Sequence, residues 1–264
     1  MPGETDAALA AEFSELLRKI RERTPARIFS GRAGAAYRTS TQLELREAHA
    51  AARDAVREEL DMQSLLGAAF IRQWNLFEVP TEAQTKEEYL LRPDLGRRFD
   101  AAAKEEILGR CPRGKEIQIV IGDGLSVTAV GAQVPDLLPL LDAGARARGW
   151  SVGRAFVIRH CRVGVINGIG ELLAPKVAIL MIGERPGLAT AESLSAYMAY
   201  EPSGTHTDAN RNLISNIHAR GLKPQAAADR ILNLAAQMMR QRISGFSVRE
   251  DLPESSSSAL REIE

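Results

Sequence analysis

The segment Ile117-Gln118-Ile119-Val120-Ile121-Gly122-Asp123-Gly124-Leu125-Ser126 decides the fold, because an apolar run ends there in a glycine-rich turn. A short apolar run bounded by glycine is typical of a buried strand. The strongest strand of the chain is expected at residues 177–182, and it ends in Gly183-Glu184-Arg185-Pro186-Gly187. Strands this apolar are usually buried on both faces, as in parallel sheets that are covered by helices.

Predicted helices alternate with predicted strands beyond this segment. We expect a helix at residues 135–148 and a strand at 155–159, while residues 162–166 either continue that strand or form another. A long helix, with its apolar residues on one face, is expected at 224–242. This alternation predicts an α/β fold, in which helices cover both faces of a mostly parallel, doubly wound sheet. Ligands bind such sheets at the carboxyl ends of the strands, where both glycine turns lie.

The first 110 residues are expected to be mostly helical. Apolar residues recur at helical spacing over residues 5–23, and Ser40 or Thr41 is expected to cap a second helix. Residues 24–39, which are rich in arginine, are expected to form a basic loop, and a third helix is expected at 93–108. The last residues, 250–264, contain four serines and many charges, so they form a tail with too little apolar surface to fold.

Composition excludes several classes of protein. The 264 residues carry 34 basic and 34 acidic side chains and only 5% aromatic residues, which argues against a protein that binds nucleic acid through phosphates or base stacking. No apolar stretch approaches the length of a membrane span, and no signal-peptide pattern is present. Cys111 and Cys161 show no C-x-x-C spacing, which fits a reducing compartment. We therefore expect a cytoplasmic protein without membrane or nucleic-acid partners.

The turn at Gly122-Asp123-Gly124 begins like a dinucleotide-binding fingerprint but departs from it. Val127 occupies the place of the third glycine, and Asp142, at the spacing of the ribose-binding acid, falls inside a predicted helix. A general ligand-binding loop and a structural turn remain open for this segment. Ser126 lacks the second glycine of a nucleophile elbow, so it is expected to cap a helix or to donate a hydrogen bond to a ligand.

The turn at Gly183-Glu184-Arg185-Pro186-Gly187 places an acid and a base at the end of the strongest strand. It is either an ordinary turn with a solvated ion pair or a ligand site. In the second case, the carboxylate would accept hydrogen bonds from the amides or hydroxyls of a large polar cofactor. The four histidines show no metal-binding spacing, so no metal site is expected on this chain.

Several motifs together point to one family. The two glycine turns are followed by Glu192-Ser193-Leu194-Ser195-Ala196-Tyr197 and Ile214-Ser215-Asn216-Ile217-His218, and Gly31-Arg32-Ala33-Gly34, Arg38-Thr39 and Leu91-Arg92-Pro93-Asp94-Leu95-Gly96-Arg97-Arg98 precede them. In order and approximate spacing, these motifs resemble the small (light) subunit of ethanolamine ammonia-lyase over roughly residues 25–248.

The resemblance implies one subunit of an adenosylcobalamin-dependent lyase that converts ethanolamine to acetaldehyde and ammonia. Its partner would be a large TIM-barrel subunit that carries most of the substrate site, in a hetero-oligomer of paired subunits. Residues 1–110 would form a helical N-terminal region, 111–249 a Rossmann-like cobalamin-binding domain and 250–264 a disordered tail. The complex would lie in the cytoplasm or in a bacterial microcompartment.

The resemblance also implies three cofactor-binding residues, and no catalytic residue, on this chain. Val163 would contact the corrinoid through its backbone and apolar side chain, and Glu184 would accept hydrogen bonds from cofactor amides or hydroxyls. Leu213, where some relatives carry cysteine, would pack against the cofactor or bond to it through the main chain.

The lower ligand of the cobalt is expected to be the cofactor's own benzimidazole. None of the four histidines lies in the Asp-x-His-x-x-Gly motif, by which other cobalamin domains replace that base. Two further classes of function stay open on the sequence: a nucleotide-binding Rossmann enzyme that acts alone, and an assembly module without catalytic activity.

Overall fold

A six-stranded mixed sheet lies at the centre of the computed structural model, which describes residues 3–23 and 30–250. The strand order is β3-β5-β4-β6-β7-β8, in which pairs among the first four strands are parallel and the last two pairs are antiparallel. The parallel part was expected, whereas the antiparallel edge was not. The strands are β3 (Glu78–Pro80), β4 (Ile117–Gly122), β5 (Phe156–Arg159), β6 (Val177–Gly183), β7 (Leu194–Tyr200) and β8 (Asn212–Ile217).

The two strands expected from their apolar runs, β4 and β6, lie side by side. All of their residues are buried, which explains why the runs contain almost no polar side chain. Their parallel register pairs Ile117 with Val177 and Gly122 with Ile182. Because the two strands run in parallel and are in register from Ile117 to Gly122, the turns that follow them meet at one edge of the sheet.

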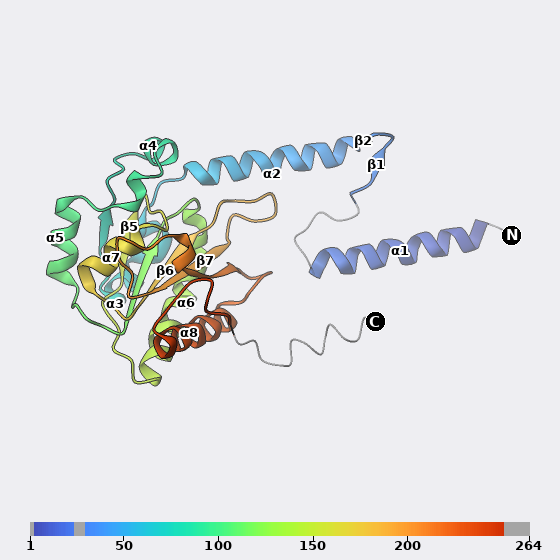
Figure 1. The fold of residues 1–264 in the computed structure, drawn as a ribbon. Helices are drawn as coiled ribbons and strands as arrows, with labels where there is room; N and C mark the ends of the chain where they lie inside the picture. The colour runs from blue at the N-terminus through green and yellow to red at the C-terminus, as the bar shows by residue number, and fades with distance from the viewer. Residues whose placement is uncertain (1–2, 24–29, 251–264) are drawn as a thin grey trace.

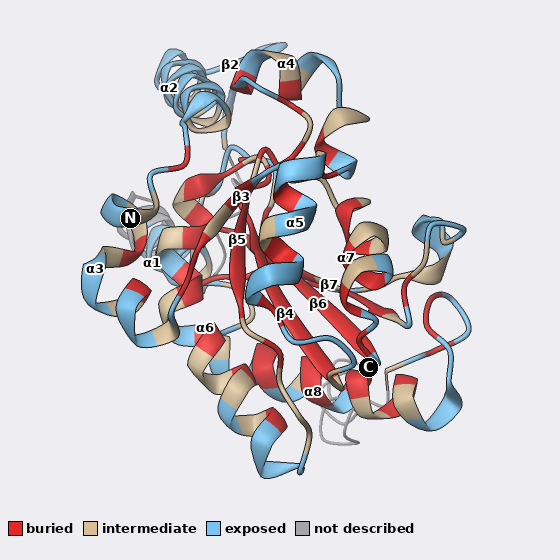
Figure 2. Ribbon diagram, turned by 90° about the vertical axis from the view of Figure 1, so that its left-hand side faces the viewer, coloured by how far each residue is buried: buried red, intermediate tan, exposed pale blue. Residues whose placement is uncertain are grey.

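Helices cover both faces of this sheet (Figure 2). Alternate residues of β4 enter two separate cores, with Ile119 and Ile121 in one and Val120 in the other. The first core includes residues of α3 (Met62–Trp74), α6 (Val127–Ala147) and α8 (Pro224–Gln241), and the second includes residues of α5 (Ala101–Arg110) and α7 (Val165–Leu173). This is the expected α/β layering, and its Rossmann-like classification stays a prediction.

Two N-terminal helices stand away from the sheet (Figure 1). They are α1 (Gly3–Arg23) and α2 (Thr39–Arg57), which confirms both expected helices, and α2 has no buried residue. The cap expected at Ser40 or Thr41 is wrong, because α2 already begins at Thr39 and its N-cap, Arg38, makes no side-chain cap hydrogen bond. Of the expected basic loop, residues 24–29 lie outside the described part of the chain. The rest contains a small hairpin of β1 (Arg32–Ala33) and β2 (Ala36–Tyr37), so a loop without strands is wrong there.

The segment expected to be a helical N-terminal region also supplies a strand of the sheet. β3 pairs in parallel with β5, and Val79 in its centre is fully buried. The short helix α4 (Lys86–Leu91) follows it. A strand of three residues is too short to show the period-two pattern by which strands are recognised. The division into domains at residues 110 and 111 stays a prediction.

The single helix expected at residues 93–108 is wrong. The structure has a 3₁₀ helix, η1 (Leu95–Arg97), and then α5, with Arg98 in extended conformation between them. The side chain of Asp100 accepts a hydrogen bond of 2.7 Å from the backbone N–H of Ala103, so it caps a new helix.

Two further predictions need correction. Residues 162–166 do not form a strand, because α7 begins at Val165. The helix expected at 135–148 begins earlier, at Val127, because Ser126 caps it, and Pro135 and Pro139 lie inside it. The capping role expected for Ser126 is confirmed, since its hydroxyl accepts from the backbone N–H of Ala129 at 3.4 Å.

The end of the chain is described only to Glu250, which pairs with Arg230 at 2.6 Å. The rest of the expected tail lies outside the described residues. Within residues 3–23 and 30–250, no helix is both long enough and apolar enough to cross a membrane.

Candidate functional site

A cavity of about 380 Å³ lies at the carboxyl ends of β4, β5 and β6, where the sequence predicts ligand binding. We call it the rim pocket. Turns from these three strands form one side of it, and residues of β7, β8 and α4 complete the lining. The lining residues are Tyr89, Gly124, Leu125, Cys161, Arg162, Val163, Ile182, Gly183, Glu184, Arg185, Ser195, Tyr197, Leu213 and Ser215.

All three residues predicted to bind a cofactor line this pocket. Val163 follows β5, Glu184 follows β6 directly, and Leu213 lies in β8. The side chains of Val163 and Glu184 are half-buried, while Leu213 is 44% exposed. Residues fifty positions apart in the sequence meet here because parallel strands end at a common edge and the antiparallel β8 returns to it.

The carboxylate of Glu184 is held in place by three hydrogen bonds. The Ser193 hydroxyl donates to Oε2 at 2.7 Å, and the Ser195 hydroxyl and the backbone N–H of Asn216 donate to Oε1 at 2.5 and 3.0 Å. A carboxylate can accept about four hydrogen bonds, so capacity for one more donor remains, on Oε2. Glu184 forms no ion pair with Arg185, which means that the solvated ion pair considered for this turn is absent.

Glycines allow the two turns to pack closely against each other, because a side chain at Gly124 or Gly183 would clash with the backbone of the other turn. Gly124 has a left-handed backbone (φ +59°), and a Cβ added to it would lie 2.2 Å from the carbonyl oxygen of Gly183. The backbone N–H of Leu125 also donates to that oxygen, at 3.1 Å. A Cβ on Gly122 would lie 2.6 Å from the sulfur of Cys161. This turn therefore gives no support to a dinucleotide site.

The acid considered for a ribose contact lies elsewhere. Asp142 is inside α6, where it binds Arg146 one helical turn away at 2.8 Å. Its position in a helix is as expected, and it does not line the rim pocket.

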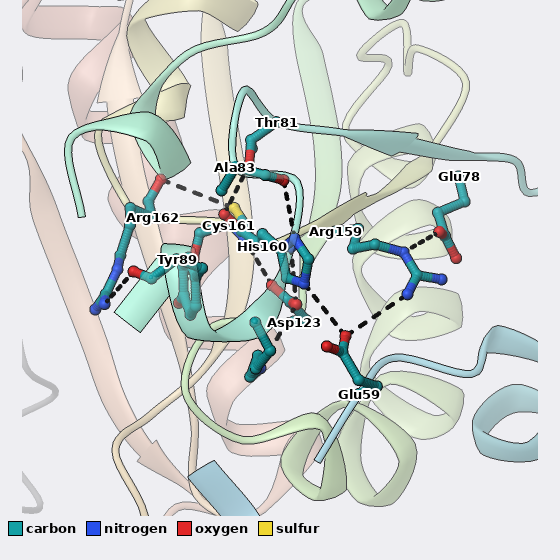
Figure 3. Close-up of polar contacts among 11 residues, drawn as sticks. Glu59, Glu78, Thr81, Ala83, Tyr89, Asp123, Arg159, His160, Cys161 and Arg162 are labelled. Carbon is teal, nitrogen blue, oxygen red and sulfur yellow. Dashed lines mark hydrogen bonds and ion pairs between the residues drawn. The ribbon is translucent and has the colours of Figure 1, made fainter. Parts of the chain in front are cut away.

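A fully buried carboxylate ties the end of β4 to the end of β5 (Figure 3). Asp123 accepts hydrogen bonds from the backbone N–H groups of His160, at 2.8 Å, and Cys161, at 2.7 Å. His160 has a left-handed backbone (φ 57°), which is typical of sites where successive N–H groups converge on an anion. Burial raises the pKa of Asp123, while the positive charge of Lys86 and these N–H groups oppose that rise. Asp123 therefore fixes the backbone of the segment that leads to Val163.

Lys86 and Tyr89 lie close to this carboxylate, and Arg162 packs on Tyr89. The ammonium of Lys86 is buried without a hydrogen-bond partner and lies 3.9 Å from the nearer oxygen of Asp123. The Tyr89 hydroxyl donates to the carbonyl oxygen of Cys161 at 2.9 Å, and burial raises the pKa of Tyr89. The Arg162 guanidinium stacks 4.2 Å from the centre of the Tyr89 ring. These contacts hold one wall of the rim pocket.

His160, which directly precedes the lining residue Cys161, is engaged in contacts with other residues of this chain. The ring of His160 contacts the carbonyl oxygen of Ala83 at 3.0 Å and a carboxylate oxygen of Glu59 at 3.2 Å (Figure 3). No histidine lines the rim pocket. Among the described residues there is no group of three or more histidine, cysteine or acidic side chains that could hold a metal ion.

Both cysteines are poor nucleophiles in this environment. Burial raises the pKa of Cys111 to about 11 and the pKa of Cys161 well above its usual value. Since the thiolate is the reactive form, neither thiol is activated for covalent chemistry.

Sequence reasoning missed the side chains that position Glu184. Ser193 and Ser195 belong to a motif already noted, but their role depends on β7, which was not expected as a strand. Two hydroxyls separated by one residue point to the same face of a strand, and that spacing is the signal that could have identified them. Tyr89 and Lys86 had no such signal.

Comparison with known proteins gives consistent matches. A family model described as ethanolamine ammonia-lyase light chain (EutC) matches residues 14–249. The ethanolamine ammonia-lyase small subunit of Clostridium perfringens is 41% identical over 231 residues, 88% of this chain and 76% of the relative. That of Listeria monocytogenes is 39% identical, covering 88% and 77%, and that of Clostridium acetobutylicum is 40% identical over 235 residues, covering 89% and 95%. The matched segment includes the whole six-stranded sheet and every residue that lines the rim pocket.

Proposed function

This chain belongs to the ethanolamine ammonia-lyase light-chain family, and we propose that its rim pocket forms part of the cobalamin site of an adenosylcobalamin-dependent ethanolamine ammonia-lyase. The chain acts as the small subunit, and the substrate site lies mainly on the large subunit. The observation that carries this proposal is the meeting of Val163, Glu184 and Leu213 in one pocket.

The pocket suits a large ligand with an apolar ring and polar amide groups at its edge. Val163, Ile182 and Leu213 present apolar surface, which can pack against the edge of a corrin ring. Glu184 presents one free acceptor position, and its carboxylate is already oriented by Ser193 and Ser195. A preorganised acceptor loses little entropy when an amide donor binds to it.

The residues of this chain bind and shield, whereas the reactive chemistry belongs to the cofactor. When bound, adenosylcobalamin supplies radical chemistry through homolysis of its cobalt–carbon bond. Because His160 is engaged with Glu59 and Ala83 and no histidine lines the pocket, this chain offers no imidazole as a lower ligand to cobalt. The lower ligand would then come from the cofactor itself, as the family resemblance implies.

The pocket needs a second polypeptide to close it. Leu213 is 44% exposed, and Arg185 on the same rim is exposed as well. Radical chemistry requires that water be excluded from the site. The large subunit, a TIM barrel, covers this side and forms a hetero-oligomer of paired subunits with the chain, in the cytoplasm or in a bacterial microcompartment.

Reconstitution tests this function. Acetaldehyde formation from ethanolamine is measured with adenosylcobalamin for this chain alone, for its large subunit alone and for the two together. We expect activity from the pair only, and none when adenosylcobalamin is left out. Activity from this chain alone would support a stand-alone enzyme, and activity of the pair without cobalamin would remove the cofactor from the proposal.

Replacement of Glu184 by glutamine should weaken cobalamin binding to the complex. The loss of one charge-assisted hydrogen bond predicts an increase in Kd of about tenfold or more. The fold should persist, because the glutamine amide oxygen can still accept from Ser195 and Asn216. The change in the absorbance spectrum of cobalamin on binding gives the Kd directly.

Glu192→Gln is the matched control for this measurement. Glu192 is exposed, follows the same turn and does not line the rim pocket. It should bind cobalamin as the unmodified chain does. If Glu184→Gln and Glu192→Gln give the same Kd, Glu184 does not contact the cofactor.

A further inference from the structure

A second cavity, of about 530 Å³, adjoins the rim pocket. We call it the basic pocket. Val163 lines the rim pocket, and the next residue, Gly164, lines the basic pocket; likewise Leu213 lines the first and Arg211 the second. The second cavity lies between η1, the start of α7 and the 3₁₀ helix η2 (Asp208–Asn210). Neither the sequence motifs nor the proposed function assigns it a role.

Four cationic side chains and three carboxylates line this pocket; the cations are Arg97, Arg98, Lys104 and Arg211, and the carboxylates are Glu82, Glu171 and Asp208. Two of the four cations, Arg97 and Lys104, lack a counter-ion among the described residues. Arg98 is engaged, since it donates to Glu82 at 2.8 Å. Arg97 and Lys104 form no hydrogen bond or ion pair through their side chains with any described residue. The stem of Arg97 packs against Gly164, where an added Cβ would lie 2.9 Å from the arginine Cγ. Arg97 is therefore held beside the cavity while its charge stays available.

Arg211, the fourth cation, is buried and incompletely satisfied. Its side chain is only 5% exposed, pairs with Asp208 and donates to Asn167 at 3.0 Å, but its Nε–H is buried without a partner. Burial lowers the pKa of Arg211 and the positive charge of Arg97 lowers it further, whereas Asp208 opposes them. Arg97 and Arg211 both line the pocket and repel each other, so an anion that binds both would stabilise them.

We propose that the basic pocket binds a phosphate-type oxyanion through Arg97 and Arg211. The planar guanidinium group matches the geometry of phosphate and can donate two parallel hydrogen bonds to two of its oxygens. The oxyanion has two chemical sources. One is the phosphodiester that joins the corrin ring of cobalamin to its benzimidazole, and this source rests on the proposed function. The other is free phosphate, which does not.

The first arm of the test uses inorganic phosphate and the full chain without cofactor. Binding is measured by isothermal titration calorimetry for the unmodified chain, for Arg97→Gln and for Arg113→Gln. Arg113→Gln is the matched control, because Arg113 is exposed, lies outside both pockets and undergoes the same loss of charge. If free phosphate is the ligand, Arg97→Gln should weaken its binding about tenfold, and Arg113→Gln should not.

The second arm uses the complex with the large subunit and two corrinoids, cobalamin and cobinamide, of which only cobalamin carries the nucleotide phosphodiester. If that group occupies the basic pocket, Arg97→Gln should raise the Kd of cobalamin about tenfold and leave that of cobinamide unchanged. Arg113→Gln should change neither value. A charged surface that acts without a specific contact would affect both corrinoids equally.

The two arms separate the possible outcomes. An effect specific to Arg97→Gln in either arm supports the basic pocket and identifies the source of the oxyanion. The absence of such an effect in both arms overturns the proposal. A complex that binds no corrinoid contradicts the proposed function, and the phosphate arm then decides the basic pocket by itself.

Discussion

Gly183→Ala is expected to destabilise the chain strongly and to deform the rim pocket. An added Cβ would lie 2.0 Å from the carbonyl oxygen of Ser126 and 2.7 Å from that of Asp123. Both are backbone atoms at the tight meeting of two turns, so neither can move without shifting β4 or β6. Overpacking of this kind costs up to about 3 kcal/mol, and a clash with fixed backbone atoms belongs at the upper end of that range. The free energy of unfolding in urea, from the midpoint and slope of the transition, measures this loss.

Gly187→Ala provides the matched control in the same turn. An added Cβ there meets nothing closer than a backbone nitrogen at 4.0 Å, and the residue is exposed. Its unfolding midpoint should equal that of the unmodified chain. If Gly183→Ala is as stable as Gly187→Ala, the two turns are not in close backbone contact at Gly183.

Asp123→Ala should lower the free energy of unfolding by a similar amount. The cause is the opposite one, because a buried hydrogen-bond acceptor is removed and no clash is introduced. The backbone N–H groups of His160 and Cys161 would lose their acceptor, and the ammonium of Lys86 would remain buried without its anionic neighbour. Two unsatisfied donors and an unpaired buried charge together predict a loss of about 3–5 kcal/mol. Chemical denaturation measures this loss of stability. The affinity of the complex for cobalamin should fall as well, because the segment that Asp123 holds, His160 and Cys161, leads directly to Val163.

Two companion variants distinguish this cause from a general packing defect. Asp123→Asn keeps one carbonyl oxygen for one of the two N–H groups, so its loss should be smaller than that of Asp123→Ala. Adding Lys86→Met to Asp123→Ala removes the unpaired charge and should restore part of the stability. The account fails if Asp123→Ala unfolds at the same denaturant concentration as Asp123→Asn, or if Lys86→Met makes it less stable.

The candidate site could be predicted in part. The family resemblance predicted Val163, Glu184 and Leu213 as cofactor contacts, and all three line the rim pocket. The strands that precede the first two, β5 and β6, were also expected. Ser193 and Ser195 show a spacing that would have placed both hydroxyls on one strand face, but the strand itself was not expected. The partners of Asp123 are 37 and 38 residues away, and no local pattern connects them.

The sequence by itself determined which segments bury apolar surface and which family the chain resembles, because these depend on the order of residues along the chain. Only the tertiary structure decided that β3 joins the sheet, that Gly124 and Gly183 meet, and that three donors already hold Glu184. Each of these depends on strand order and register between distant segments. An apolar pattern states that a surface must be covered, but it does not state which part of the chain covers it.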